Sequence, residues 1–315
     1  MLPDGARVGR VARPTPVDDG PDAVVAACVA ALRDARRAST TRAPNPAAVG
    51  ISAPGPLDPW AGVIHDAPNL GPAFPGTPIA RLVQDEIGLP AFLDRDTNVA
   101  ALAEMTYGAA RGIDDFLYFT VSTGVGGAIV SEGRIIHGPD GMAGELGHLQ
   151  VDLEGARCSC GGVGHVESMA SGRALTDAGR QAAETGRSPY LVQRAATAGL
   201  DSIDAQDVAE GEDAGDLVCR DILSAARRVF AAACTSAVNA FNPTRIVVGG
   251  SVAHYQGDRL LQPARDAVAI GTFRIPGRRV TIVLAELGPD VSLAGAYPLV
   301  TSRLMKNARP EEVRS

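Results

Sequence analysis

The sequence has no cluster of positive charge, no long apolar run and no cysteine framework, and each of these absences excludes a class of protein. Its 29 basic residues are outnumbered by 36 acidic ones, which argues against a nucleic-acid-binding surface. No apolar run reaches the length of a membrane span, and the N-terminus lacks the apolar core of a signal peptide. We therefore expect a cytoplasmic globular protein, whose 315 residues can bury a substantial core as one two-lobed unit or as two domains.

Cysteine is scarce, with five residues in the chain. Cys28, Cys219 and Cys234 are scattered through apolar helical patterns, which is typical of buried thiols and not of a disulfide framework. Cys158 and Cys160 differ from these three because a single residue separates them. Two such cysteines are too close to bridge each other comfortably, yet both can face one metal ion.

The segment around these two cysteines has the composition of a metal loop. Three glycines between Cys160 and His165 allow the backbone to fold around an ion, and His148 lies ten positions before Cys158. His148, Cys158, Cys160 and His165 supply the two nitrogen and two sulfur ligands of a closed, structural zinc site. The alternative is a glycine-rich loop with two reduced cysteines and two surface histidines.

Strand-like and helix-like patterns alternate along the chain, which predicts an α/β protein with mainly parallel sheet. Helices are predicted over residues 21–37, 77–87, 98–110, 167–185, 215–241 and 292–303. Strands are predicted over residues 7–14, 49–51, 91–93, 116–130 with a turn at 122–127, 134–136, 245–250 and 280–285. No repeat of solenoid length is present.

Asp96 stands where a predicted strand ends and a helix begins, a usual place for a catalytic group in α/β proteins. A carboxylate at such a position can take a proton from a substrate hydroxyl within hydrogen-bond reach. Asp is equally favoured there as a helix N-cap, so local sequence leaves both interpretations open.

Two glycine-rich segments follow predicted strands. Ser122 to Gly127 forms a turn whose backbone N–H groups can cradle phosphate oxygens, although glycine hairpins also occur without any ligand. Gly249-Gly250-Ser251 can admit a nucleotide, or only a closely packed helix.

Two acidic residues bracket the metal loop: Glu145 precedes His148 by three residues and Glu167 follows His165 by two. If a metal ion fixes the loop, both carboxylates are held in place and can accept hydrogen bonds from the hydroxyls of a sugar. Alternatively, both are ordinary solvated acids.

Together these motifs resemble those of the ROK family of bacterial sugar kinases and repressors, over about residues 7 to 300. The segments that carry the resemblance are Ala53-Pro54-Gly55-Pro56, Ala67-Pro68-Asn69-Leu70, Arg95-Asp96-Thr97-Asn98, Ser122 to Gly127, Gly144 to His148, Cys158 to Glu167, Asn242-Pro243 and Gly249-Gly250. The resemblance implies an actin-like ATPase (ribonuclease H-like) fold with two lobes around a central cleft.

In function, the resemblance implies a homodimeric kinase that transfers phosphate from ATP, with Mg²⁺, to a hexose, glucose first among the candidates. Asp96 falls on the catalytic base of the family. The implied sugar contacts are Gly55, Asn69, Asp96, Glu145, His148 and Glu167. The implied nucleotide contacts are Thr123, Gly124, Gly126, Gly127, Gly249 and Gly250, and the implied ligands of a structural Zn²⁺ are His148, Cys158, Cys160 and His165.

The expected lobes are residues 1–97 with 292–305, and residues 98–291, followed by a disordered tail at 306–315. Three departures from the family pattern stand out. His165 replaces a third cysteine, and imidazole is a competent zinc ligand. Arg95 replaces an asparagine, which can change the choice of sugar or weaken Asp96 as a base. The Asp-x-Gly-Gly-Thr-Lys phosphate loop has no match, from which we expect a true start upstream.

Two rival functions remain open at this point. One is a sugar-sensing repressor of the same family without its DNA-binding domain, since no recognition-helix pattern is visible. The other is a catalytically weak protein that binds sugar.

Overall fold

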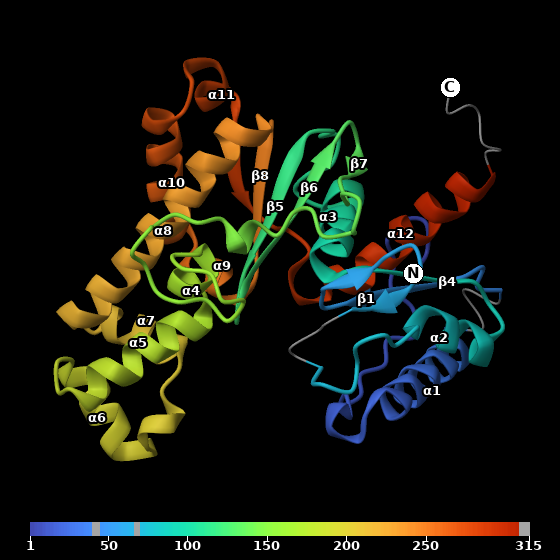
Figure 1. The fold of residues 1–315 in the computed structure, drawn as a ribbon, viewed down its shortest axis with the longest axis horizontal. Helices are drawn as coiled ribbons and strands as arrows, with labels where there is room; N and C mark the ends of the chain where they lie inside the picture. Colours follow the sequence, from blue (N-terminus) through green and yellow to red (C-terminus); the bar gives the residue numbers. More distant parts are fainter. Residues whose placement is uncertain (40–44, 66–69, 309–315) are drawn as a thin grey trace. The chain divides into compact units, whose positions relative to one another are not determined.

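The structure is a computed structural model and describes residues 1–39, 45–65 and 70–308. The described residues form two compact units (Figure 1). The first unit comprises Met1–Gly112, Ile135–Ala143 and Glu286–Ser315, and the second comprises Ile113–Arg134 and Gly144–Ala285. The expected first lobe is residues 1–97 with 292–305. The first unit is larger than this, because it also contains the helix that follows Arg95.

The first unit is built on two parallel strands, β1 (Val49–Ala53) and β4 (Ala91–Arg95), with a small hairpin of β2 (Leu57–Asp58) and β3 (Val63–Ile64). Its helices are α1 (Pro21–Ser39), α2 (Ile79–Ile87), α3 (Asp96–Tyr107) and α12 (Val291–Ala308). Successive side chains of β4 point to opposite faces. Leu93 accordingly packs with the cluster of α1 and α2, whereas Phe92 packs with α3 and α12.

A buried polar network ties β4 to its surroundings within this unit. Asp94, only 1% exposed, accepts hydrogen bonds from Asn98 Nδ2 at 2.8 Å and Arg303 Nη2 at 3.3 Å, and lies 2.8 Å from His137 Nε2. Burial by itself raises the pKa of the Asp94 carboxyl, but His137, Asn98 and Arg303 together bring that pKa below its ordinary value. The ring of Trp60 lies 5.4 Å from that of His137.

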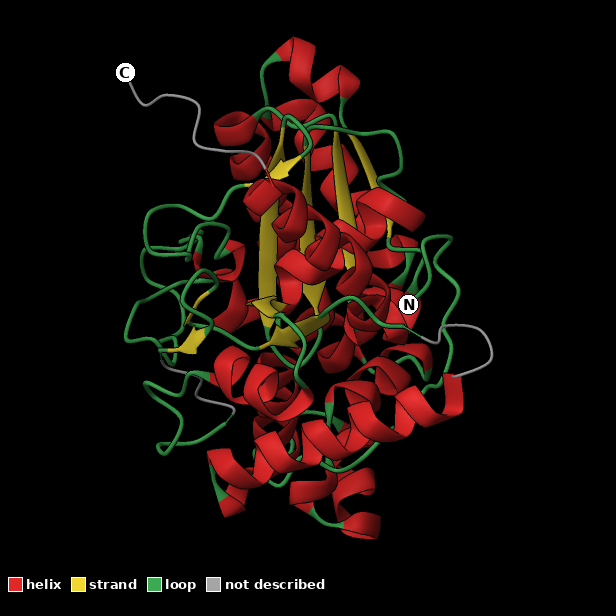
Figure 2. Cartoon of the chain, turned by 90° about the vertical axis from the view of Figure 1, so that its right-hand side faces the viewer, coloured by secondary structure: helices red, strands yellow, loops and turns green. Residues whose placement is uncertain are grey.

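The second unit contains a five-stranded sheet in the order β7-β6-β5-β8-β9. Strands are drawn in yellow in Figure 2. Its strands are β5 (Phe116–Val121), β6 (Val125–Ser131), β7 (Arg134–Ile135), β8 (Arg245–Gly249) and β9 (Thr281–Leu284). β5, β8 and β9 run parallel, and β5 and β6 form an antiparallel hairpin. The central strands read as continuous apolar runs because parallel strands are buried on both faces.

The helices of the second unit are α4 (Val166–Ala170), α5 (Gly172–Glu184), α6 (Pro189–Ala198), α7 (Ala205–Asp213), α8 (Leu217–Phe241), α9 (Ser251–Gln256), α10 (Asp258–Gly271) and α11 (Arg274–Arg279). Phe119 of β5 meets Phe230 of α8 edge-on, with ring centroids 5.6 Å apart, in the centre of the core. Short 3-10 helices cover Val17–Asp19, Leu146–His148, Leu200–Ser202 and Gly288–Asp290. In the described part of the chain, no helix combines the length and the apolar character that crossing a membrane requires.

The prediction of a strand over residues 7–14 is wrong, because the described backbone there is irregular. The segment is held through its side chains instead: Arg7 and Arg10 pair with Asp290, and Arg13 pairs with Asp34. The sequence patterns also missed the helices α6, α7, α9, α10 and α11 of the second unit.

Candidate functional site

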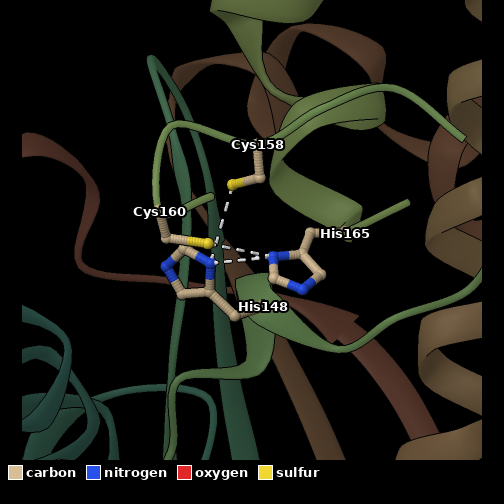
Figure 3. A group of neighbouring side chains, drawn as sticks. All are labelled: His148, Cys158, Cys160 and His165. Atoms are coloured by element: carbon tan, nitrogen blue, oxygen red, sulfur yellow. Dashed lines mark hydrogen bonds between the residues drawn. The ribbon is translucent and has the colours of Figure 1, made fainter. Parts of the chain in front are cut away.

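Four side chains converge in the second unit as the sequence predicts (Figure 3). His148, Cys158, Cys160 and His165 each offer one ligand atom, and these atoms all lie within 4.8 Å of one another. His148 Nδ1 lies 3.3 Å from His165 Nδ1 and 3.7 Å from Cys158 Sγ, and Cys160 Sγ lies 3.3 Å from His165 Nδ1.

These separations fit a tetrahedral zinc ion. With Zn–N bonds of about 2.05 Å and Zn–S bonds of about 2.3 Å, tetrahedral geometry places two nitrogens about 3.3 Å apart and a nitrogen and a sulfur about 3.6 Å apart. The nitrogen pair and two of the four nitrogen–sulfur pairs lie close to these values. The donor set and its geometry therefore suit a structural metal with no open position.

The backbone of the metal loop explains its glycines. Gly161 and Gly164 have φ angles of 94° and 65°, a region that side-chain-bearing residues avoid. The loop is closed by hydrogen bonds from Cys158 N to Gly162 O at 2.8 Å and from Gly161 N to Cys158 O at 2.9 Å. Val166 N, directly after His165, donates to Leu149 O, directly after His148, at 3.1 Å. The two histidines are therefore held together by the backbone as well.

Glu167 lies against the glycine-rich turn between β5 and β6. Its Oε2 accepts a hydrogen bond from Val125 N at 3.0 Å, and a Cβ on Gly124 would stand 2.6 Å from that oxygen. A side chain on Gly124 would thus displace the carboxylate. The structure brings together one predicted sugar contact and one predicted phosphate contact, which the sequence treats separately.

The segment that carries Glu145 and His148 packs on the same hairpin. A Cβ on Gly127 would stand 2.7 Å from the side chain of Leu146, and Gly147 closely approaches Val125 O. Gly127 thus has a packing reason to be glycine. Glu145 is half-buried at the start of this segment.

The ends of β5 and β8 meet at one edge of the sheet, where Ser122 Oγ lies 3.0 Å from Ser251 Oγ. Gly249 ends β8, and Gly250, with a φ of 97°, passes close to Val121. Gly126 lies in β6 opposite Thr120. Asn242 is the C-cap residue of α8 and precedes β8, whereas Gly250 follows β8. These two residues therefore lie at opposite ends of the strand.

A cavity of about 680 Å³ opens beside Thr123 and Ser251, a size usual for small-molecule sites of about 300–1,000 Å³. Its walls come from the β5–β6 turn and from α5, α7 and α9. Residues of several kinds line it, namely Thr123, Arg173, Asp177, Asp204, Val252 and Tyr255. Of these residues, only Thr123 was predicted from the sequence. The one sequence feature that could have indicated the others is Ser171, a typical helix N-cap residue directly before Gly172 and Arg173.

Asp96 lies in the first unit at the first position of α3. Among residues 93–104 it alone is exposed and all others are buried. Its Oδ1 accepts a hydrogen bond from Thr97 N at 2.7 Å, while the N-cap position belongs to Arg95, whose side chain makes no capping bond. The strand and helix hold Asp96 rigidly while leaving its carboxylate accessible.

Arg95, which precedes Asp96 in the chain, lies against Gly55 in the fold. Arg95 is 2% exposed, and its Nη2 donates to Ala143 O and to Asn98 Oδ1. A Cβ on Gly55 would stand 3.0 Å from Arg95 Cδ, so glycine makes room for the arginine stem. The predicted sugar contact Asn69 lies outside the described residues.

The chain resembles known proteins both in sequence and in fold. The family model described as "ROK family" matches residues 4–303. A glucokinase of Halalkalibacterium halodurans is 34% identical over 253 residues, covering 80% of this chain and 75% of that protein. A xylose repressor of Caldicellulosiruptor bescii is 26% identical over 257 residues, covering 82% of this chain and 63% of the repressor.

Solved structures give the same result. A ROK hexokinase from Thermus thermophilus matches with a TM-score of 0.78 and 33% identity, covering 94% of this chain and 91% of that one. A ROK family glucokinase from Streptomyces griseus, in complex with glucose and AMPPNP, matches with a TM-score of 0.77 and 29% identity, covering 96% and 93%. The predicted α/β, actin-like fold is thereby confirmed.

Proposed function

The chain belongs to the ROK family, and from this premise we propose that it is an ATP-dependent sugar kinase, with glucose as the first substrate to test. The observation that carries the proposal is Asp96, the one accessible side chain in a buried strand-to-helix segment. A carboxylate held in this way suits a general base, which needs a fixed position and access to substrate.

In the proposed reaction, the Asp96 carboxylate accepts the proton of the sugar hydroxyl as the hydroxyl oxygen attacks the γ-phosphorus of ATP. The bond from the γ-phosphorus to the β–γ bridging oxygen breaks, and ADP leaves. Phosphoryl transfer depends mainly on positioning and charge stabilisation. Thr123, which lines the cavity at the end of β5, would face the phosphates of a nucleotide. The further nucleotide contacts that we propose are Gly124, Gly126, Gly127, Gly249 and Gly250. Mg²⁺, when bound with ATP, neutralises phosphate charge.

For the sugar, we propose contacts from Gly55, Asn69 and Asp96 and from Glu145, His148 and Glu167. The hydrogen bond between Glu167 and Val125 N supports a role in which this carboxylate also fixes the phosphate turn. We assign His148, Cys158, Cys160 and His165 to a structural Zn²⁺, which would stiffen the loop that presents Glu167. We also propose that the protein forms a homodimer.

The direct test is a coupled ADP-release assay over a panel of hexoses, with size measurement of the protein in solution. Release that depends on one or a few hexoses, at rates well above ATP hydrolysis without sugar, supports the kinase. Sugar binding by calorimetry without any sugar-dependent ADP release contradicts it.

A second candidate is a sugar-binding regulator. It is favoured by the similarity to repressors. The charge of Arg95 next to Asp96 also favours it, because a nearby cation weakens a carboxylate as a base. Specific binding of promoter DNA in a mobility-shift assay, weakened or strengthened by sugar, would favour this candidate over the kinase.

A further inference from the structure

The charged side chains that line the cavity beside Thr123 are not equally available. Arg180 donates its guanidinium hydrogens to the carbonyls of Asp201 and Ile203. Asp204 caps α7 by accepting hydrogen bonds from Gln206 N at 2.8 Å and Asp207 N at 3.1 Å. Both side chains therefore have structural partners and hold the cavity wall in place.

Arg173 has no such role. Its side chain is exposed, and no hydrogen bond or ion pair within the described residues holds its guanidinium. It is also the second residue of α5, and its backbone N donates to Thr123 O at 3.1 Å. That bond fixes the arginine directly beside the glycine-rich turn.

The start of α5 cannot serve the cavity with its backbone. Helix N-termini bind anions through N–H groups that lack partners within the helix. Here Gly172 N donates to Ser122 O at 2.7 Å, Arg173 N donates to Thr123 O, and Ala174 N donates to Ser171 Oγ at 3.1 Å. Because these three donors are occupied, a phosphate group at this end of the cavity has to be recognised by a side chain.

We propose that Arg173 is a further phosphate-binding residue of the nucleotide site, contacting the diphosphate part of the phosphoryl donor through its guanidinium. This inference rests on the proposed kinase function and adds a residue to it. A guanidinium binds phosphate through paired N–H···O bonds and keeps its charge at any physiological pH. Asp177, one helical turn further along α5, sets the other end of the contact, because an acidic side chain disfavours phosphate there and suits the ribose hydroxyls.

The test compares two ligands that differ only in phosphate. ADP with Mg²⁺ and adenosine are titrated calorimetrically into the wild-type protein, Arg173→Gln and Arg173→Lys. Arg228→Gln is the matched control, since Arg228 is an exposed arginine of α8 outside the cavity. Thermal unfolding of each variant establishes that the fold is retained.

We expect Arg173→Gln to weaken ADP binding by about ten- to one-hundredfold, the range for loss of a charged hydrogen-bond donor, with adenosine affinity unchanged. The ADP affinity of Arg173→Lys should lie between those of the wild type and Arg173→Gln, and that of Arg228→Gln should match the wild type. In kinetic assays the KM for ATP should rise without a change in the KM for sugar.

Two outcomes overturn the inference. The first is ADP affinity in Arg173→Gln within twofold of the wild type. The second is an equal loss of ADP and adenosine binding, which would give Arg173 a role in cavity shape. Arg173-dependent ADP binding without sugar phosphorylation would support the inference and contradict the kinase, so the two failures are distinguishable.

Discussion

Glu167 and Val125 join the metal loop to the glycine-rich turn: the carboxylate of Glu167 accepts the backbone N–H of Val125 at 3.0 Å. Glu167 follows the candidate ligand His165 by two residues, and Val125 begins β6. Rigidity supplied by a metal ion in the cluster would therefore be transmitted to the turn through one hydrogen bond and a close contact with Gly124.

Removal of the metal should loosen both segments. Purified protein is expected to contain one zinc per chain, and Cys158→Ser should lose it and melt about 5–10 °C lower. Cys28→Ser, in α1 of the first unit, is the control and should keep its zinc. His165→Cys should also retain the metal, because thiolate replaces imidazole as a ligand. Metal analysis with calorimetry checks these outcomes, and zinc-free wild-type protein with unchanged melting would contradict the site.

Two substitutions separate the roles of Glu167. Glu167→Ala leaves Val125 N without its acceptor and should destabilise the protein by about 1–3 kcal/mol. Glu167→Gln keeps an acceptor oxygen and should melt close to the wild type, yet bind glucose more weakly because a charged acceptor is lost. Unchanged sugar affinity in Glu167→Gln, measured by calorimetry, would remove Glu167 from the sugar site.

Asp96→Asn should abolish phosphorylation while leaving the fold intact. The amide cannot accept the hydroxyl proton, and loss of general-base catalysis lowers kcat by about 10²–10⁴-fold. Asp85→Asn is the matched control, because Asp85 is an exposed carboxylate of α2 in the same unit. Turnover by Asp96→Asn near that of Asp85→Asn would exclude Asp96 as the base.

The network around Asp94 predicts a dependence of stability on pH. Its folded-state pKa is lowered below the ordinary value of 3.8, so its contribution is complete above that value and is lost as the pH falls through the lowered pKa. Asp94→Asn should lower stability near neutral pH by about 3 kcal/mol, because Arg303 and His137 lose their buried partner. It should also flatten the acid limb of a calorimetric pH series. An acid limb as steep as that of the wild type would contradict this assignment.

Thiol reactivity should follow burial. Cys219 and Cys234 are fully buried, and burial raises the pKa of both, that of Cys219 to about 11, so neither should react with a thiol reagent in the folded protein. Chelation of the metal should expose Cys158 and Cys160 as two additional reactive thiols. Labelling of all five cysteines before unfolding would contradict the burial of Cys219 and Cys234.

The convergence of the four candidate metal ligands could be predicted from sequence because they fall within a short stretch of chain, where spacing alone restricts the geometry. Asp96 could be placed for a similar reason: a strand end and a helix start are local patterns. Even so, the sequence could not decide between a cap and an accessible base. Only the burial of its neighbours favours the accessible carboxylate.

The cavity could not be predicted, since Thr123, Arg173, Asp204 and Tyr255 are far apart in the chain and meet only through the packing of β5, α5, α7 and α9. The glycines of the turn were likewise ambiguous. Gly124 and Gly127 are explained by the side chains that press on them, Glu167 and Leu146, and contacts of that kind leave no periodic pattern in a sequence.

Trp60 is the one tryptophan of the chain, and its ring lies against His137 in the first unit, whereas all four candidate metal ligands belong to the second. Indole fluorescence therefore comes from the first unit alone. A metal ion that absorbs visible light, such as Co²⁺, bound in the cysteine–histidine cluster would report on the second unit. Protein loaded with Co²⁺ would thus carry two independent optical signals, with which the order of melting of its two units can be followed in a single experiment.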